Sequence, residues 1–225
     1  MRIAFFGGTF DPPHRGHLAI AQAAADRLRL DRVLFAPVGN QPLKQNVSSA
    51  SFEDRIAMVR LAIAGDARFA LSMVDAPRAD GSPNYTIDTV RMLKTSLLPE
   101  DQLFCLVGAD SFLSLPRWHR AGELLPACDF IVAGRPGFDL QNVEGLLPPL
   151  VRLAGEPQHA QDLVTFRLAD ANGQTSTLYF LPDLKETTSA TEVRSALAGG
   201  WIDNSAVPAP VAEYIGAHHL YNDGK

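Results

Sequence analysis

The chain has 225 residues, of which 46% are hydrophobic and 20% are charged, and its formal net charge is −5. This length and composition are typical of one globular domain with a substantial core. The negative charge argues against a general nucleic-acid-binding protein, which normally presents a basic face. It leaves room for an anionic small molecule in a local basic pocket.

Neither a membrane span nor a secretion signal is expected. No apolar stretch approaches the ~18 residues that cross a bilayer, and the apolar run at 3–6 is too short for a signal peptide. Cys105 and Cys128 lie in apolar surroundings and are expected to be reduced. We therefore expect a cytoplasmic protein without membrane partners, and a homo-oligomer is compatible with the sequence.

The first residues predict a β-α-β unit. Residues 2–6 form a short apolar run that ends in a glycine pair, which indicates a buried strand. Residues 16–30 carry Leu18, Ala21, Ala25 and Leu28 on one helical face, and an apolar strand follows at 33–36. A strand, a helix and a strand in about 35 residues predict a parallel sheet.

The alternation continues along the chain. Helical spacing of apolar residues is found at 51–64, 86–97, 191–198 and 211–218. The first of these ranges begins at Ser51 with a sequence that resembles a capping box. Strand-like runs lie at 69–74, 103–107, 130–133 and 178–181. The stretch 138–177 shows no sustained period and is predicted to be a long connection with some local structure. The pattern predicts one domain over 1–225, a doubly wound, Rossmann-like α/β fold with a small helical C-terminal part from about residue 188.

The strongest functional signal is the sequence GGTFDPPHRGH at 7–17, between the first strand and the first helix. Ligands of open parallel sheets bind beyond the carboxyl ends of the strands. Glycines let the backbone approach a phosphate, and the following helix offers unpaired N–H groups. His14 and His17 lie three residues apart and can face the same anion.

The motif also has other interpretations. Neither the Walker lysine pattern nor the G-x-G-x-x-G spacing is present, which excludes those phosphate-loop classes. The H-x-x-H spacing can supply half of a metal site, but no Cys/His cluster provides further ligands, so no metal-binding residue is assigned. A purely structural turn also stays open.

The motif resembles the signature of the nucleotidylyltransferase superfamily, specifically of bacterial nicotinate-nucleotide adenylyltransferases. The H-x-G-H element at 14–17 is common to the superfamily, including cytidylyltransferases, and by itself indicates the reaction but not the acceptor. Further segments resemble the bacterial family: NYTIDT at 84–89, GADS at 108–111 with the later Trp118, GRPG at 134–137 and SATEVR at 189–194. The resemblance therefore covers nearly the whole chain.

The resemblance implies transfer of the AMP part of ATP to nicotinate mononucleotide. This chemistry, and no ligand spacing in the sequence, implies Mg²⁺ bridging the ATP phosphates. His14 and His17 are the candidates for the α-phosphate, together with the backbone of the residues Gly7, Gly8, Thr9 and Phe10. The resemblance places Lys44 and Arg194 on phosphates, with Ser189 and Thr191 beyond them. A solvated loop lysine and a surface arginine are the alternatives.

Separate residues are candidates for the two nucleosides. Gly108 and Asp110 follow a strand and are candidates for the adenosine, although Asp110 can instead cap a helix. On the mononucleotide side, the resemblance implies stacking of the pyridine ring on Trp118 and a carboxylate near Tyr85 and Thr86. Asn40 is a loop candidate there, Trp118 can instead be a core residue, and His119 is assigned no role.

One position departs from the family pattern, because Ala190 stands where a second hydroxyl is usual. This departure keeps open a non-enzymatic nucleotide sensor, alongside the same chemistry on nicotinamide mononucleotide or phosphopantetheine. The predicted mechanism is direct in-line attack without a covalent intermediate. A phosphate whose second pKa is about 6 is already an anion at neutral pH, so the attack needs no general base.

Overall fold

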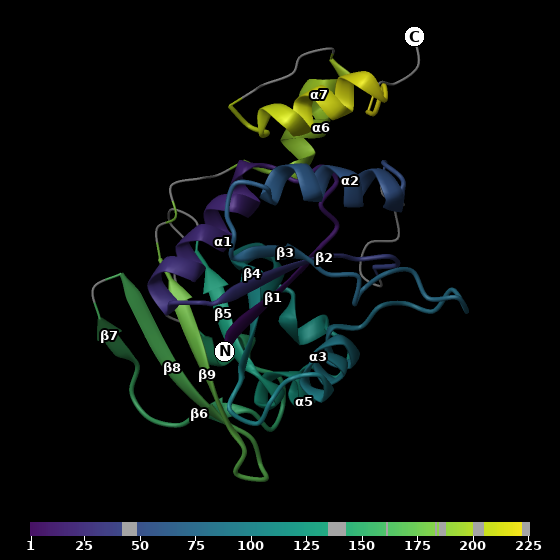
Figure 1. Cartoon of the computed structure of the whole chain (residues 1–225). Helices are drawn as coiled ribbons and strands as arrows, with labels where there is room; N and C mark the ends of the chain where they lie inside the picture. The colour runs from purple at the N-terminus through teal and green to yellow at the C-terminus, as the bar shows by residue number, and fades with distance from the viewer. Residues whose placement is uncertain are drawn as a thin grey trace.

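The computed structural model describes residues 1–41, 49–134, 143–160, 162–182, 184, 188–199 and 205–221, and Figure 1 shows its arrangement. The strands are β1 (Arg2–Gly8), β2 (Arg32–Pro37), β3 (Phe69–Leu71), β4 (Gln102–Gly108), β5 (Asp129–Ala133), β6 (Arg152–Leu153), β7 (Gln158–Ala160), β8 (Leu163–Ala169) and β9 (Thr175–Leu181). The helices are α1 (Arg15–Leu28), α2 (Phe52–Ile63), α3 (Thr86–Thr95), α4 (Ala109–Leu113), α5 (Ala121–Ala127), α6 (Ala190–Ala198) and α7 (Ala209–Ala217), and the 3-10 helices are η1 (Leu115–Arg117) and η2 (Val143–Leu146).

All these strands belong to one sheet, in the order β3-β2-β1-β4-β5-β9-β8-β6, and β7 also pairs with β8. The pairs from β3 to β9 are parallel. From β1 the chain winds outward to β2 and β3 and then returns to β4 on the other side. A crevice at the carboxyl ends of β1 and β4 is the usual ligand site of such a sheet. The predicted doubly wound fold is confirmed.

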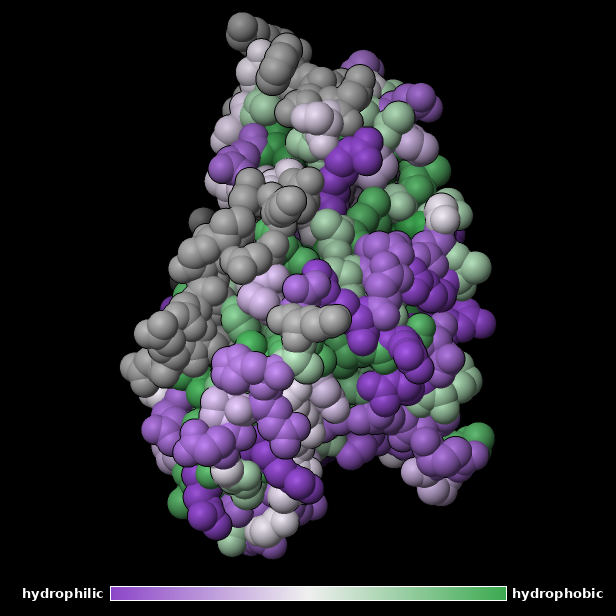
Figure 2. Space-filling model, turned by 90° about the vertical axis from the view of Figure 1, so that its left-hand side faces the viewer, coloured by the Kyte–Doolittle hydropathy of each residue, from purple (hydrophilic) through white to green (hydrophobic). Residues whose placement is uncertain are grey.

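The expected long connection at 138–177 is in part wrong, because much of it adds strands to the sheet. β8 pairs antiparallel with β9, and β6 and β7 pair antiparallel with β8. The β8–β9 turn is held by Asp170, whose carboxylate accepts N–H groups from Asn172 and Gln174 at 2.9 and 2.8 Å. These strands are short or half exposed, so they lack the continuous apolar run of a central strand. Figure 2, which views this side of the molecule, shows a mainly hydrophilic face.

The helices cover both faces of the sheet, as Figure 1 shows. On one face α1 and α2 pack over the side chains of Ala4 and Phe6, and on the other α3 and α5 pack over Phe5. This alternation along β1 follows from the two-residue period of a strand. Cys105 and Cys128 are both free and buried, in agreement with the apolar surroundings expected for them.

The helices α4 and α5 were not predicted from the sequence, whereas α2 was, and its Val59 and Ile63 are buried. The side chains of Arg55 and Met58 are buried there, whereas Phe52 and Ile56 are only half-buried. Ser51 does cap α2, accepting the N–H of Asp54 at 3.0 Å. The buried Arg55 marks the end of α2 that faces the motif loop.

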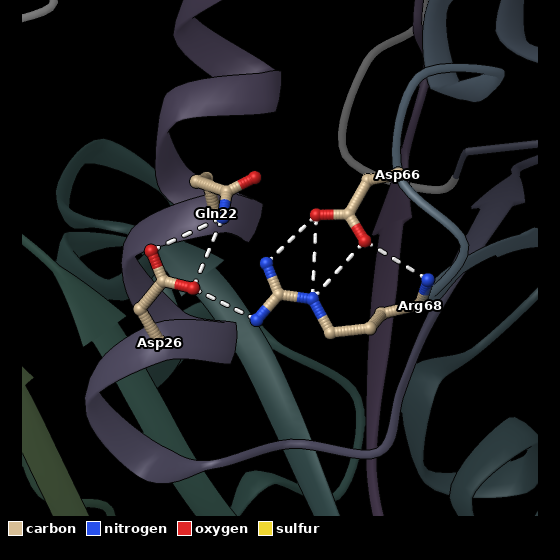
Figure 3. A network of polar contacts seen from close by, with 4 residues as sticks. All are labelled: Gln22, Asp26, Asp66 and Arg68. Carbon is tan, nitrogen blue, oxygen red and sulfur yellow. Dashed lines mark hydrogen bonds and ion pairs between the residues drawn. The ribbon is translucent and has the colours of Figure 1, made fainter.

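A surface network joins α1 to the turn between α2 and β3 (Figure 3). The Arg68 guanidinium contacts the carboxylate of Asp66 at 2.7 Å and that of Asp26 at 2.8 Å. The Gln22 amide donates to Asp26 from the preceding turn of α1, at 3.0 Å. These contacts lower the pKa of both carboxyl groups. Ion pairs this exposed contribute little to stability individually, so the network mainly orients the α2–β3 turn.

The C-terminal helices α6 and α7 form a small layer of their own above α2 (Figure 1). Their apolar side chains, including Val193, Leu197 and Val211, pack against Ala50 and Met58 in a cluster separate from the two sheet faces. This layer agrees with the predicted helical C-terminal part. Within the described residues, no helix is long and apolar enough to cross a membrane.

Candidate active site

The two motif histidines lie against each other at the start of α1. Their ring centroids are 3.7 Å apart, and the His14 backbone N–H donates to His17 Nδ1 at 3.2 Å. A neutral imidazole that accepts at Nδ1 carries its proton on Nε2. The side chain of His14 is 6% exposed, and that of His17 is half-buried beside the Phe10 ring. The pair therefore forms a preformed, partly desolvated donor group at the carboxyl end of β1.

Gly16 has a steric reason to be glycine. A Cβ on this residue would lie 2.8 Å from the Thr188 carbonyl oxygen and 3.0 Å from His14 Cε1. Both distances are too short for a carbon–oxygen or carbon–carbon contact. The close approach brings the first turn of α1 against the residues that lead into α6.

Further contacts attach the α6 region to the motif loop. The Arg194 guanidinium donates to the Asp11 carbonyl at 2.7 Å, and the Arg15 N–H donates to the Ala206 carbonyl at 2.9 Å. The structure thus brings Arg194 beside the histidine loop, as the adenylyltransferase resemblance implies. Thr191 is exposed and lies 3.5 Å from an Arg194 nitrogen.

Ser189 caps α6 instead of standing free. Its hydroxyl donates to the Glu192 carboxylate at 2.7 Å, and that carboxylate accepts the Ser189 N–H at 3.1 Å. This capping box orients the N-terminus of α6, with Ala190 as its first residue. A phosphate that uses the Ser189 hydroxyl must compete with Glu192.

The glycine pair of the motif is also tightly surrounded. A Cβ on Gly7 would lie 2.7 Å from the Phe5 ring, and one on Gly8 would lie 3.1 Å from the Phe10 ring. Thr9 donates from its hydroxyl to Gln41 Oε1 at 2.8 Å. This bond joins the motif loop to the residues after β2.

The candidate Asn40 is held by Asn84. The Asn40 N–H donates to Asn84 Oδ1 and the Asn84 N–H to the Asn40 carbonyl, both at 3.0 Å. The Asn40 side chain itself donates to the Gly81 carbonyl at 3.0 Å. The role of Asn84, which is buried, was missed although it stands first in the quoted NYTIDT segment. It fixes the loop after β2 against the residues that precede α3.

The mononucleotide candidates meet at the start of α3. Tyr85 is the N-cap of α3 and Thr86 its first residue. The Tyr85 ring stacks on His119, with centroids 4.0 Å apart and planes 26° apart, which brings the segment of Trp118 alongside. Trp118 packs partly into the core, and its indole N–H donates to Ser114 Oγ at 2.9 Å. His119, which was assigned no role from its sequence context, therefore connects the two expected walls of the pyridine pocket.

Gly108 and Asp110 lie where β4 ends and α4 begins, on the other side of the sheet's switch point. Gly108 is the N-cap of α4, so the alternative that Asp110 caps this helix is wrong. Asp110 is exposed in the first helical turn. Both residues therefore lie at the carboxyl end of β4, next to that of β1.

Two candidate features fall outside the described residues. Lys44 lies there, as do Arg135, Pro136 and Gly137 of the GRPG segment. The proposed phosphate contact of Lys44 therefore stays a prediction.

Two buried charged residues near the motif were missed. Arg55 donates to the Thr9 and Val38 carbonyls at 2.7 and 2.9 Å, and burial lowers its pKa. Asp75 accepts a hydrogen bond from the Thr89 hydroxyl, and burial raises the pKa of its carboxyl to about 6. A Cβ on Gly7 would lie 3.6 Å from Asp75 Oδ2, so this carboxyl lies below the glycine pair. The only sequence signal for Arg55 is an arginine among the apolar residues of α2.

No group of three or more His, Cys, Asp or Glu side chains lies together in the part of the chain that the structure describes. A third ligand beside the H-x-x-H spacing is thus not found among those residues.

The fold and the site define a class: a doubly wound α/β protein with a histidine pair and a helix N-terminus at the switch point. The Cytidylyltransferase-like family matches residues 5–196. The chain belongs to this family.

Relatives cover the whole chain. A protein of Gloeobacter violaceus named "Probable nicotinate-nucleotide adenylyltransferase" is 40% identical over 98% of this chain and 96% of its own. One of the same name from Pseudomonas syringae pv. tomato is 37% identical over 98% and 93%. The nicotinic acid mononucleotide adenylyltransferase of Plasmodium falciparum, solved in complex with NaAD, has the same fold. Its TM-score is 0.71 at 16% identity, over 98% of this chain and 97% of that one.

Proposed function

We propose that this protein transfers the adenylyl group of ATP to nicotinate mononucleotide and releases nicotinate adenine dinucleotide and pyrophosphate, a step of NAD biosynthesis. The observation that carries the proposal is the His14–His17 pair at the end of β1, with Arg194 attached to the same loop. The names of the relatives at 36–40% identity support the same acceptor.

The proposed step is a single in-line displacement. An oxygen of the mononucleotide 5′-phosphate forms a bond to the α-phosphorus of ATP, and the bond from that phosphorus to the bridging oxygen of the β-phosphate breaks. The electron pair leaves with pyrophosphate. The attacking phosphate is already ionised, so the protein has to align two anions and stabilise the charge that develops between them.

His14 and His17 supply hydrogen-bond donors for that charge. Because its Nδ1 accepts the His14 N–H, a neutral His17 carries its proton on Nε2, and this N–H is proposed to donate to an α-phosphate oxygen. The backbone of Gly7, Gly8, Thr9 and Phe10 and the N-terminus of α1 contribute further donors and a positive dipole end. Because the histidines are held before ATP binds, little reorganisation accompanies the reaction.

Arg194 is proposed to bind the leaving phosphates, with Thr191, Ser189 and Lys44 beside it. Gly108 and Asp110 are proposed to contact the adenosine. Mg²⁺ is expected to enter with ATP as its phosphate complex and to neutralise part of the triphosphate charge.

The acceptor pocket is proposed at the start of α3. Trp118 stacks on the pyridine ring, Tyr85 and Thr86 meet its carboxylate, and Asn40 lies on the same side. A helix N-terminus favours an anion, so the carboxylate of nicotinate is expected to bind better there than the neutral amide of nicotinamide. We further propose that the protein acts in the cytoplasm, where its two free cysteines stay reduced.

The test is pyrophosphate release with Mg-ATP and nicotinate mononucleotide, compared with nicotinamide mononucleotide and phosphopantetheine. His17→Ala is the matched control and is expected to lose about 10²–10³-fold in rate, as for one donor to a developing negative charge. Preference for nicotinate mononucleotide supports the proposal. Preference for another acceptor keeps the chemistry and refutes the pocket assignment, and ATP binding without turnover favours the sensor alternative that Ala190 suggests.

A further inference from the structure

The carboxylate of Asp11 lies in the motif loop, but it has no role in the proposed reaction. It is 4% exposed. Its Oδ2 accepts the Ser49 N–H at 2.7 Å, and its Oδ1 accepts the Ala50 N–H at 3.2 Å and the Tyr221 hydroxyl at 2.7 Å. The one side-chain donor among these three comes from a residue 210 positions further along the chain.

Tyr221 reaches Asp11 from the turn that follows α7. The Leu220 N–H donates to the Ile215 carbonyl at 3.1 Å and that of His219 to the Gly216 carbonyl at 3.3 Å, which folds this turn back on the helix. Tyr221 itself has a φ of 64°, a conformation that is unfavourable for a bulky side chain and persists where surrounding contacts impose it. Burial and the Asp11 carboxylate raise the pKa of the phenol, so the hydroxyl keeps its proton and donates at neutral pH.

The same residue, Asp11, also receives the proposed phosphate-binding arginine. Its carbonyl accepts from Arg194 at 2.7 Å, while its carboxylate accepts from Tyr221. Asp11 therefore joins the loop of His14 and His17 to both C-terminal helices, α6 through Arg194 and α7 through Tyr221. The apolar side chains of these helices pack against Ala50 and Met58, in a cluster outside the two clusters of the sheet. The two bonds to Asp11 attach this layer to the histidine loop itself.

We propose that Tyr221 is a positioning residue for the transfer reaction: by holding the Asp11 carboxylate it fixes the histidine loop relative to Arg194. This inference rests on the proposed adenylyl transfer. Removing the phenol hydroxyl leaves the Asp11 carboxylate with two backbone donors. The loop that carries the two histidines and the carbonyl acceptor of Arg194 is then held less firmly. Small displacements of aligned groups reduce turnover more than ground-state binding.

The chain offers a matched control in Tyr214. Its hydroxyl donates to the Asp54 carboxylate at 2.9 Å, so it too joins the C-terminal layer to the rest of the protein through a tyrosine–aspartate bond. This bond attaches α7 to α2 and has no contact with the motif loop. Tyr214→Phe therefore also removes a tyrosine–aspartate bond of the C-terminal layer, but it leaves the bond that holds the histidine loop intact.

The experiment compares Tyr221→Phe, Tyr214→Phe and the parent in pyrophosphate release at a temperature well below all three melting temperatures. Tyr221→Phe is expected to lower kcat about tenfold, the effect of one lost hydrogen bond to a charged group, with the KM for the mononucleotide within about twofold. Tyr214→Phe is expected to keep kcat within about twofold even if its melting temperature falls equally. Equal kcat values for the two variants would overturn the proposal.

A second pair of variants tests the route through Asp11. Asp11→Asn weakens the same bond from its other partner, so the loss of kcat in the double variant Asp11→Asn/Tyr221→Phe is expected to be smaller than the product of the two single losses. Losses of kcat that multiply would show that Tyr221 does not act through Asp11. Failure of the proposed function itself would be recognised separately, as a parent protein that releases no pyrophosphate.

Discussion

The substitution Asp75→Asn is expected to stabilise the protein at neutral pH. The Asp75 side chain is 5% exposed, and burial raises the pKa of its carboxyl from 3.8 to about 6. One pH unit corresponds to about 1.4 kcal/mol, so the folded state holds the ionised carboxylate at a cost of about 3 kcal/mol above pH 6. Asparagine has the same shape and still offers Oδ1 to the Thr89 hydroxyl.

The sign follows from the direction of the pKa change. Because the folded state binds the proton more tightly than the unfolded state, stability falls as pH rises from 3.8 towards 6 and stays reduced above that. The variant should therefore exceed the parent by about 3 kcal/mol at pH 8 and by about half as much at pH 5.

The assay is urea unfolding of both proteins at several pH values between 5 and 8, followed by far-UV circular dichroism. Asp80→Asn is a suitable control, because Asp80 lies with Asp75 in the segment between β3 and α3 but is exposed. Hydrogen bonds from Ser82 lower the pKa of the Asp80 carboxyl. The control substitution should bring no gain at any pH. An Asp75→Asn protein that is less stable than the parent at pH 8, or whose advantage does not change with pH, would refute the reasoning.

Three further predictions concern the loops around the site. Gly16→Ala should lower the free energy of unfolding by about 1–3 kcal/mol and reduce kcat, because the new Cβ meets Thr188 and His14; normal urea unfolding and kinetics would contradict the tight fit. Asn84→Ala should raise the KM for the mononucleotide about tenfold with a smaller change in the KM for ATP, since its amide holds Asn40; equal changes in both KM values would argue against a local effect. Arg55→Met should lower the free energy of unfolding in urea by about 1–3 kcal/mol, because the Thr9 and Val38 carbonyls lose their donor. Arg60→Met, at an exposed position of the same helix, should leave this free energy unchanged.

The sequence by itself predicted the central sheet and the position of the motif. Buried parallel strands form continuous apolar runs, as in β4, and their alternation with helices predicts that they pair in parallel. The antiparallel strands β6, β7 and β8 escaped because β6 and β7 have only two and three residues and the first residues of β8 are half-buried, so none of them shows a continuous apolar run. The short helices α4 and α5 escaped because five and seven residues are too few to show a helical period.

The site divides in the same way. The pairing of His14 with His17 is local, since residues three apart at a helix start are neighbours, and the sequence alone determined it. The bonds from Arg194 and Tyr221 to Asp11 span 183 and 210 residues, and no spacing rule connects residues so far apart. Only the packing of α6 and α7 against α2 and the motif loop decided those contacts, because they depend on where the whole sheet places the ends of its strands.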